Sequence, residues 1–159
     1  MVQPELRRGG VTIALVDTSV FCELLPVPGM DSDRARLSAA LKEKIEEREH
    51  LLLPMATILE TGNHIGQHGD GQKRRETAKL FVDWVNKAVE GTSPFAATSF
   101  VNANELKSWL DEFPDWANRG SGLGDLSIVK EWERQCALHP QRRVYVWSKD
   151  AHLQALDRG

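Results

Sequence analysis

Cysteine is scarce in this chain of 159 residues, since only Cys22 and Cys136 are present and they stand far apart. Zinc ribbons need cysteine pairs at short spacings such as CxxC, so this class is excluded. The apolar run at residues 11–16 is far shorter than the ~20 residues that a membrane-spanning helix needs, and no cleavage-site pattern follows it. We therefore expect reduced thiols in a cytoplasmic protein with no membrane partner.

An excess of positive charge is also lacking. The chain has 20 Lys and Arg against 23 Asp and Glu, which gives a net charge of −3. No general positive field therefore attracts nucleic acid, and a polyanion would have to be held by local basic residues, by metal ions or by a site shared across a homodimer. With 41% hydrophobic residues, the chain is long enough to form a sizeable core.

Strand-like and helix-like patterns alternate along the chain. The predicted strands are residues 11–16, 51–53, 93–100 and 142–148, and the predicted helices are 31–50, a helix that begins near 56, 72–90, 102–113 and 122–136. Such alternation predicts an α/β fold, with a parallel sheet of about four or five strands flanked by helices. We expect one domain over residues 1–159, with residues 1–10 as a flexible lead.

Acidic residues lie where the predicted strands end or where the following helices begin. Asp17 follows the first strand, Glu60 lies about one turn into the helix after the second, Asp125 opens the helix that starts at "GLGD", and Asp150 follows "VYVWS". In a parallel sheet, ligands bind at the carboxyl ends of the strands. We therefore expect the four carboxylates to converge.

Clustered carboxylates repel one another unless cations lie among them. Hard oxygen ligands suit Mg²⁺ or Mn²⁺. The pattern predicts a metal site made by Asp17, Glu60, Asp125 and Asp150.

Four segments together resemble the PIN domain family, whose best-populated branch is the ribonuclease toxins of bacterial toxin–antitoxin pairs. They are "VDTSVF", "ATILETGNHI", "GLGDLSIV" and "VYVWSKDAHLQAL", in that order, and the resemblance runs from about Val11 to about Leu156. It implies a compact parallel sheet flanked by helices and a Mg²⁺- or Mn²⁺-dependent endoribonuclease that cleaves RNA with the four acids. Ser19 and Ser148 match the family's hydroxyl residues that position a metal-bound water. An antitoxin that covers the acidic groove is the implied partner.

Two features depart from the family pattern. Gly62 and Gly66 follow Glu60 closely and disfavour a helix, and Lys149 lies directly beside Asp150, where its ammonium could compete with a cation. A PIN-like domain that binds or scaffolds without cutting is therefore the main alternative.

Each acid also has a structural interpretation. Asp17 could cap the helix that follows it, and Glu60 could lie on a solvated helix face. Asp125 could be an acid that the helix dipole favours in the first turn, and Asp150 could merely end a strand. Four such coincidences in one order are less common than one shared site.

Other patterns compete less well. Glu60, His64 and His68 could form a zinc ladder on one helix face, although the intervening glycines oppose it. "RGSGLGD" lacks the Lys and Ser or Thr of a phosphate-binding loop and is better explained as a helix start. The clusters "QKRRE" and "QRRV" could hold phosphates or lie on solvated faces.

An aromatic group in "WLDEFPDW" has two interpretations. We expect Trp109 and Phe113 to pack in the core, and Trp116 to lie exposed at a partner surface.

Two rival classes of protein are disfavoured by the residues that follow Asp17. A phosphoaspartate phosphatase needs a second acid two residues later, where this chain has Ser19, and a receiver domain needs an acidic pair at the end of the first strand, where this chain has Thr18.

Overall fold

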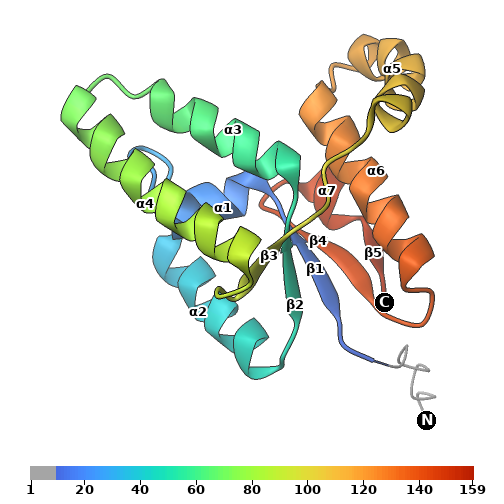
Figure 1. The fold of residues 1–159 in the computed structure, drawn as a ribbon, viewed down its shortest axis with the longest axis horizontal. Helices are drawn as coiled ribbons and strands as arrows, with labels where there is room; N and C mark the ends of the chain where they lie inside the picture. Colours follow the sequence, from blue (N-terminus) through green and yellow to red (C-terminus); the bar gives the residue numbers. More distant parts are fainter. Residues whose placement is uncertain (1–9) are drawn as a thin grey trace.

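The computed structural model describes residues 10–159, so residues 1–9 of the expected N-terminal lead lie outside the described part. Strands and helices alternate along most of the chain (Figure 1). The elements are β1 (Ile13–Val16), α1 (Thr18–Leu24), α2 (Arg34–Glu46), β2 (His50–Leu53), α3 (Met55–Gly66), α4 (Gly71–Glu90), β3 (Phe95–Ala97), α5 (Ala103–Asn118), α6 (Leu123–Leu138), β4 (Val144–Trp147), α7 (Ala151–Gln154) and β5 (Asp157–Arg158).

The strands form one five-stranded sheet in the order β3-β2-β1-β4-β5. Strands β1 to β4 run parallel, and the short β5 pairs antiparallel with β4. The predicted α/β class is therefore confirmed. The central position of β1 explains why all four of its residues are buried, because helices cover both faces of such a sheet.

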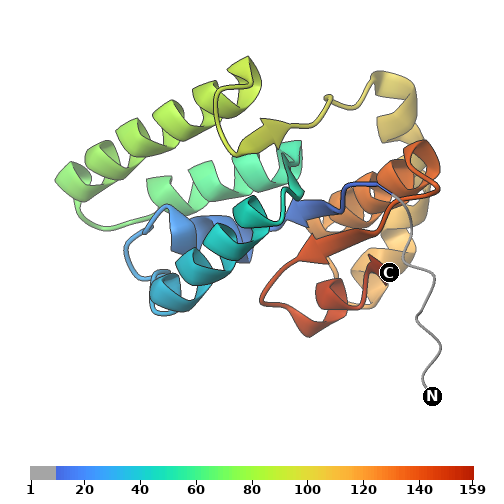
Figure 2. The same cartoon turned by 90° about the horizontal axis from the view of Figure 1, so that it is seen from below.

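Alternate residues of β1 serve two separate cores. Ala14 and Val16 belong to a large cluster with residues of α1, α2 and α4, whereas Leu15 packs with residues of α6 and α7. Figure 2 shows α2 and α4 on one side of the sheet and α6 on the other. The period-2 alternation of a strand thus builds a three-layer domain.

An aromatic group fixes α1 and α4 against the sheet edge. The ring centroids of Phe21 and Trp84 are 5.9 Å apart, and those of Phe21 and Phe95 are 5.8 Å apart. Both pairs are edge-to-face, the arrangement that ring quadrupoles favour. The position of α1 matters because this helix begins directly after Asp17.

Helix α5 differs from the prediction in two ways. It continues to Asn118 with Pro114 inside it, and none of its residues is buried, so the expected core packing of Trp109 and Phe113 is wrong. Trp109 instead lines a small surface pocket. Trp116 is half-buried and not fully exposed as expected, and its ring centroid lies 5.3 Å from the Arg119 guanidinium carbon. Few core contacts depend on this helix, so a proline within it is tolerated.

No helix within residues 10–159 combines the length and the apolar character needed to cross a bilayer.

Candidate active site

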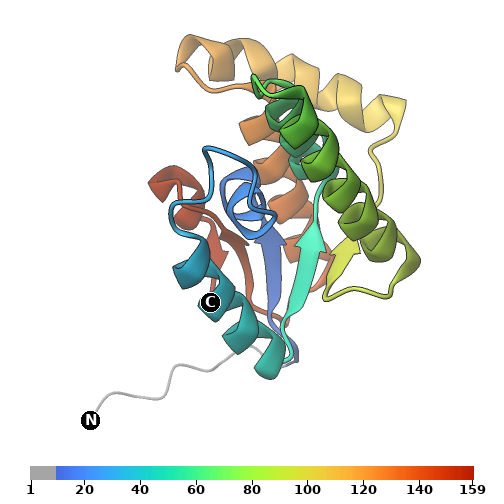
Figure 3. The same ribbon diagram turned by 90° about the vertical axis from the view of Figure 1, so that its left-hand side faces the viewer.

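The four predicted acids come from four different elements around one end of the sheet. In Figure 3 the arrows of β1 and β2 point toward the end where α3 and α5 lie. Asp17 follows β1 directly, and Asp150 follows the adjacent strand β4 by three residues, while Glu60 lies on α3 and Asp125 in the first turn of α6. Val16 pairs with Trp147, so β1 and β4 end at the same level.

The Asp17 side chain does not cap the helix that follows it, although Asp17 is the N-cap residue of α1. Its residue is 7% exposed, and its side chain makes no capping hydrogen bond to α1. Instead, Oδ2 accepts hydrogen bonds from Ser19 Oγ at 2.9 Å and from Ser148 Oγ at 2.8 Å. The helix-capping interpretation of this residue is therefore wrong.

The two serines link α1 to the segment after β4. Their hydroxyl oxygens are 3.3 Å apart, Ser19 Oγ accepts a hydrogen bond from the Lys149 backbone N–H at 3.0 Å, and Ser148 Oγ accepts one from the Asp150 N–H at 2.9 Å. Each hydroxyl thus donates in one direction and accepts in another. This network fixes the Asp17 carboxylate relative to the chain that carries Asp150.

Glu60 faces the same region from α3. Its Oε2 accepts a hydrogen bond from Thr18 Oγ1 at 2.9 Å, on the residue next to Asp17. Its Oε1 occupies the space beside Gly124, because a Cβ built at that glycine would lie only 1.6 Å from it. The carboxylate of Glu60 therefore lies between the neighbours of Asp17 and of Asp125.

The pKa of the Asp125 carboxyl is affected by the other acids. Partial burial raises the pKa of its carboxyl, and the negative charges of Asp17 and Asp150 raise this pKa further. A backbone hydrogen bond with Gly122 and the charge of His152 act in the opposite direction. The three aspartates therefore share one electrostatic environment.

Asp150 has a structural role as well. It is exposed, and its Oδ1 accepts a hydrogen bond from the His152 N–H at 2.8 Å, which caps α7. The sequence did not predict this helix-capping role, which occupies one carboxylate oxygen of Asp150.

Lys149 does not lie among the acids of the site. Its ammonium is 2.6 Å from Glu23 Oε1 and 2.8 Å from Asp33 Oδ2. Hydrogen bonds with Asp33 and Glu23 raise the pKa of Lys149, which favours its charged form. Both acids that pair with Lys149 are therefore residues other than the four predicted site acids.

The oxygen donors fit Mg²⁺ or Mn²⁺ in kind, but they do not close around one point. Among residues 10–159, no group of three or more Asp, Glu, His or Cys side chains is arranged so that it could hold a metal ion. Mg²⁺ commonly keeps several waters and takes only one or two carboxylates directly. A partly hydrated ion is therefore the kind of ligand that this open cluster suits.

The competing zinc ladder is not formed. Helix α3 continues through both glycines to Gly66, so His68 lies beyond its end. His68 Nδ1 accepts a hydrogen bond from the Asp70 N–H at 3.1 Å, while His64 is exposed on α3. The glycine-rich "RGSGLGD" segment leads into α6, with Gly122 as its N-cap, as a helix start should.

Three residues of this region were not predicted from the sequence. Thr18 binds Glu60, Gly124 makes room for it, and Glu23 holds Lys149. Their only sequence signal is adjacency, since Thr18 and Gly124 stand directly beside predicted site acids and Glu23 lies one turn beyond Ser19.

Comparison of the chain with protein-family models, with curated proteins and with solved structures finds no match.

Proposed function

We propose that the chain is a Mg²⁺- or Mn²⁺-dependent endoribonuclease that resembles PIN domains. The observation that carries the proposal is the Asp17 carboxylate, which is nearly buried at the end of the central strand and is oriented by two serine hydroxyls instead of capping a helix. A buried, oriented carboxylate is costly to the fold unless it has a partner or a function. The adjacent Glu60, Asp125 and Asp150 provide the rest of an acidic site.

The proposed roles follow from the contacts. Asp17, Glu60, Asp125 and Asp150 would hold the ion, which supplies an activated water and neutralises charge on the scissile phosphate. Ser19 and Ser148 orient Asp17, and Thr18 orients Glu60. No side chain of the site needs to act as a nucleophile, so RNA products should carry a 5′ phosphate and a 3′ hydroxyl.

The biological setting belongs to the same proposal. By its resemblance to the toxin branch, the protein would be a homodimer whose activity is held in check by an antitoxin, and expression of the chain alone would slow growth. A net charge of −3 means that RNA must be captured by local basic residues or across the dimer.

The second candidate is a PIN-like binding or scaffolding module that does not cut. The observation that favours it is the absence, within the described chain, of three side chains already arranged around a metal position. The catalytic proposal is favoured over this one by the placement of all four acids around the carboxyl ends of the parallel strands, where such sheets bind ligands.

One experiment separates the two. Purified wild-type protein should cleave a mixture of single-stranded and hairpin RNA in Mn²⁺ and leave 5′-phosphate ends. The cleavage rate of Asp17→Asn should be at least about 100-fold lower. The control Asp111→Asn, which changes an exposed acid on α5, should retain full activity. Equal growth on expression of the wild type and of Asp17→Asn, with no cleavage by either, would favour the scaffolding module. Cyclic phosphate ends would exclude a water attack.

A further inference from the structure

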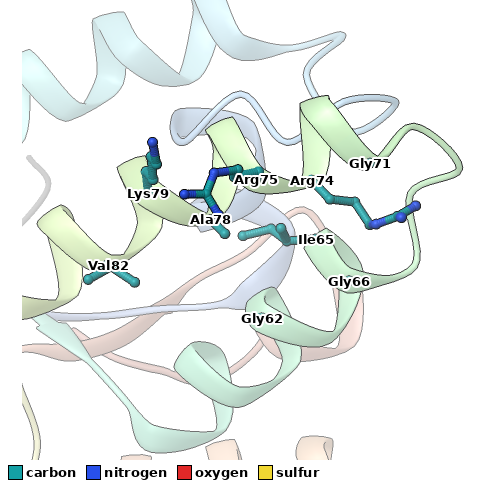
Figure 4. Close-up of a pocket in the computed structure, with 9 residues that line it drawn as sticks. All are labelled: Gly62, Ile65, Gly66, Gly71, Arg74, Arg75, Ala78, Lys79 and Val82. Carbon is teal, nitrogen blue, oxygen red and sulfur yellow. The ribbon is translucent and has the colours of Figure 1, made fainter.

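A shallow groove runs between α3 and α4, away from the acidic site. Its volume is about 770 Å³, and Figure 4 shows the residues that line it. Gly62, Ile65 and Gly66 line it from α3, whereas Glu60 points elsewhere, because at 100° per residue these three lie roughly half a turn around the helix from Glu60. The groove is therefore a surface distinct from the candidate active site.

The two glycines leave the groove open and do not bring helices into close contact. A Cβ built at Gly66 would meet no atom within 4 Å, and one at Gly62 would meet only the Phe81 ring, at 3.8 Å. Glycine in a helix is less favourable than alanine, and here no close packing compensates for it. The two glycines instead leave an accessible groove, whose floor is formed by backbone and apolar side chains.

The rim of the groove is basic. Arg75 and Lys79, both exposed, lie one turn apart on α4, and within residues 10–159 neither side chain makes a hydrogen bond or an ion pair. Like charges at this spacing repel each other. Arg74, beside them, donates a hydrogen bond to the His68 carbonyl. Val82, 52% exposed, extends the apolar floor.

From this geometry we propose that the groove binds an amphipathic helix of a partner protein, with small or aliphatic side chains on the glycine floor and Asp or Glu facing Arg75 and Lys79. Charge complementarity selects an acidic segment, and the floor gives it apolar anchors in the manner of a helix held in a groove. A second copy of this chain fits poorly, because a symmetric contact would place one basic rim against another. Single-stranded RNA also fits poorly, because no aromatic side chain lines the floor for bases to stack on.

The test uses a display library of 16-residue helical peptides, randomised on one face and selected on the wild-type protein. We expect enrichment of sequences with Ala or Leu at positions i, i+3 and i+4 flanked by Asp or Glu. A synthetic enriched peptide should bind at least tenfold more weakly to Arg75→Glu/Lys79→Glu and to Gly66→Leu, and severalfold more weakly at 300 mM than at 50 mM salt.

Matched controls keep the result specific. Lys42→Glu/Lys107→Glu reverses two exposed charges on α2 and α5, and Asn63→Leu adds an exposed leucine to α3 outside the groove; both should bind the peptide as the wild type does. Lys79→Glu alone serves if the double variant unfolds. Three outcomes would each overturn the proposal. The selection could fail to enrich acidic helices, or the enriched peptide could bind the groove variants as tightly as the wild type. The third outcome is that a 20-nucleotide RNA binds the wild type and this binding is lost in Gly66→Leu.

Discussion

Lys149 Nζ lies 2.6 Å from Glu23 Oε1, and this ion pair joins the chain after β4 to α1. The Glu23 side chain is only 3% exposed, and its second oxygen, Oε2, accepts a hydrogen bond from the Asp33 N–H at 3.0 Å. Because Lys149 stands between Ser148 and Asp150, the pair anchors the segment that carries both. The lysine that raised doubt about the acidic site therefore supports its geometry.

Removing this lysine should destabilise the fold. Lys149→Met leaves a buried carboxylate without its cation, which we expect to lower the free energy of unfolding by about 1–3 kcal/mol, below the full range for buried pairs because Lys149 is partly exposed. Urea denaturation measures the change. The double variant Lys149→Met/Glu23→Gln should recover much of the loss, and Lys87→Met, which breaks an exposed pair with Asp83, should cost about 0–0.5 kcal/mol. Equal effects of the two lysine variants would contradict the anchoring role.

Divalent ions should stabilise the protein through the acidic site. At an ion concentration ten times Kd, binding adds about 1.4 kcal/mol, which corresponds to a rise of roughly 3–5 °C in Tm for a chain of this size. Thermal unfolding with and without Mn²⁺ should show this rise in the wild type and in Asp111→Asn, a smaller one in Glu60→Gln, and none in Asp17→Asn. A shift that survives in Asp17→Asn would place the ion elsewhere.

The pH dependence of the stability of the metal-free protein should reveal the unfavourable environment of the Asp125 carboxylate. Its pKa is raised in the folded state by partial burial and by Asp17 and Asp150, so its favourable contribution is complete below the ordinary carboxyl pKa and is lost as pH rises through the folded value. Asp125→Asn should therefore be at least as stable as the wild type at pH 7, with no such advantage at pH 3. Urea denaturation in EDTA at the two pH values tests this, and a variant less stable at pH 7 would argue against shared repulsion.

The fold class was predictable because strand-like and helix-like segments alternate, and the structure confirms a mostly parallel sheet. Helix α1 was not predicted as an element, because six of its seven residues are buried and such a segment lacks the polar face that gives a helical period. The extent of α5 was also missed, because Pro114 normally marks a helix end.

The position of the acids could be expected from the rule that sites gather at the carboxyl ends of parallel strands. Their partners could not. Whether Asp17 caps α1 or accepts from Ser148 depends on side-chain rotamers of residues 131 positions apart, and local patterns carry no information on that choice. The same holds for Glu23 and Lys149, which are 126 positions apart.

Alkaline conditions should lower the stability of the fold through two buried groups. Burial raises the pKa of the Cys22 thiol to about 11. Burial and the hydrogen bond to Glu49 likewise raise the pKa of the Tyr145 hydroxyl. The neutral thiol and the neutral phenol each contribute to the stability of the fold, fully so below their ordinary pKa values of 9.0 and 10.0. These contributions are lost as the pH rises, so the free energy of unfolding should fall above about pH 9. Cys22→Ala and Tyr145→Phe should each reduce the loss between pH 8 and pH 10.5, measured by urea denaturation, whereas a loss of the same size in the double variant would assign it to other groups.

A single added methyl group at Gly124 should separate stability from function. The new Cβ would overlap Glu60 Oε1, 1.6 Å away, and this flexible carboxylate would have to leave its place beside Thr18. Alanine also favours the first turn of α6 by about 0.5–1 kcal/mol, so Tm in the absence of metal should stay the same or rise. The Mn²⁺-dependent rise in Tm should become smaller, as in Glu60→Gln, and the RNA cleavage rate should fall at least tenfold. Gly66→Ala, another helical glycine with open space around it, should raise Tm similarly and leave both readouts unchanged. If Gly124→Ala behaves like this control, then the position of Glu60 does not matter to the site, and Asp17 with the other two aspartates must suffice.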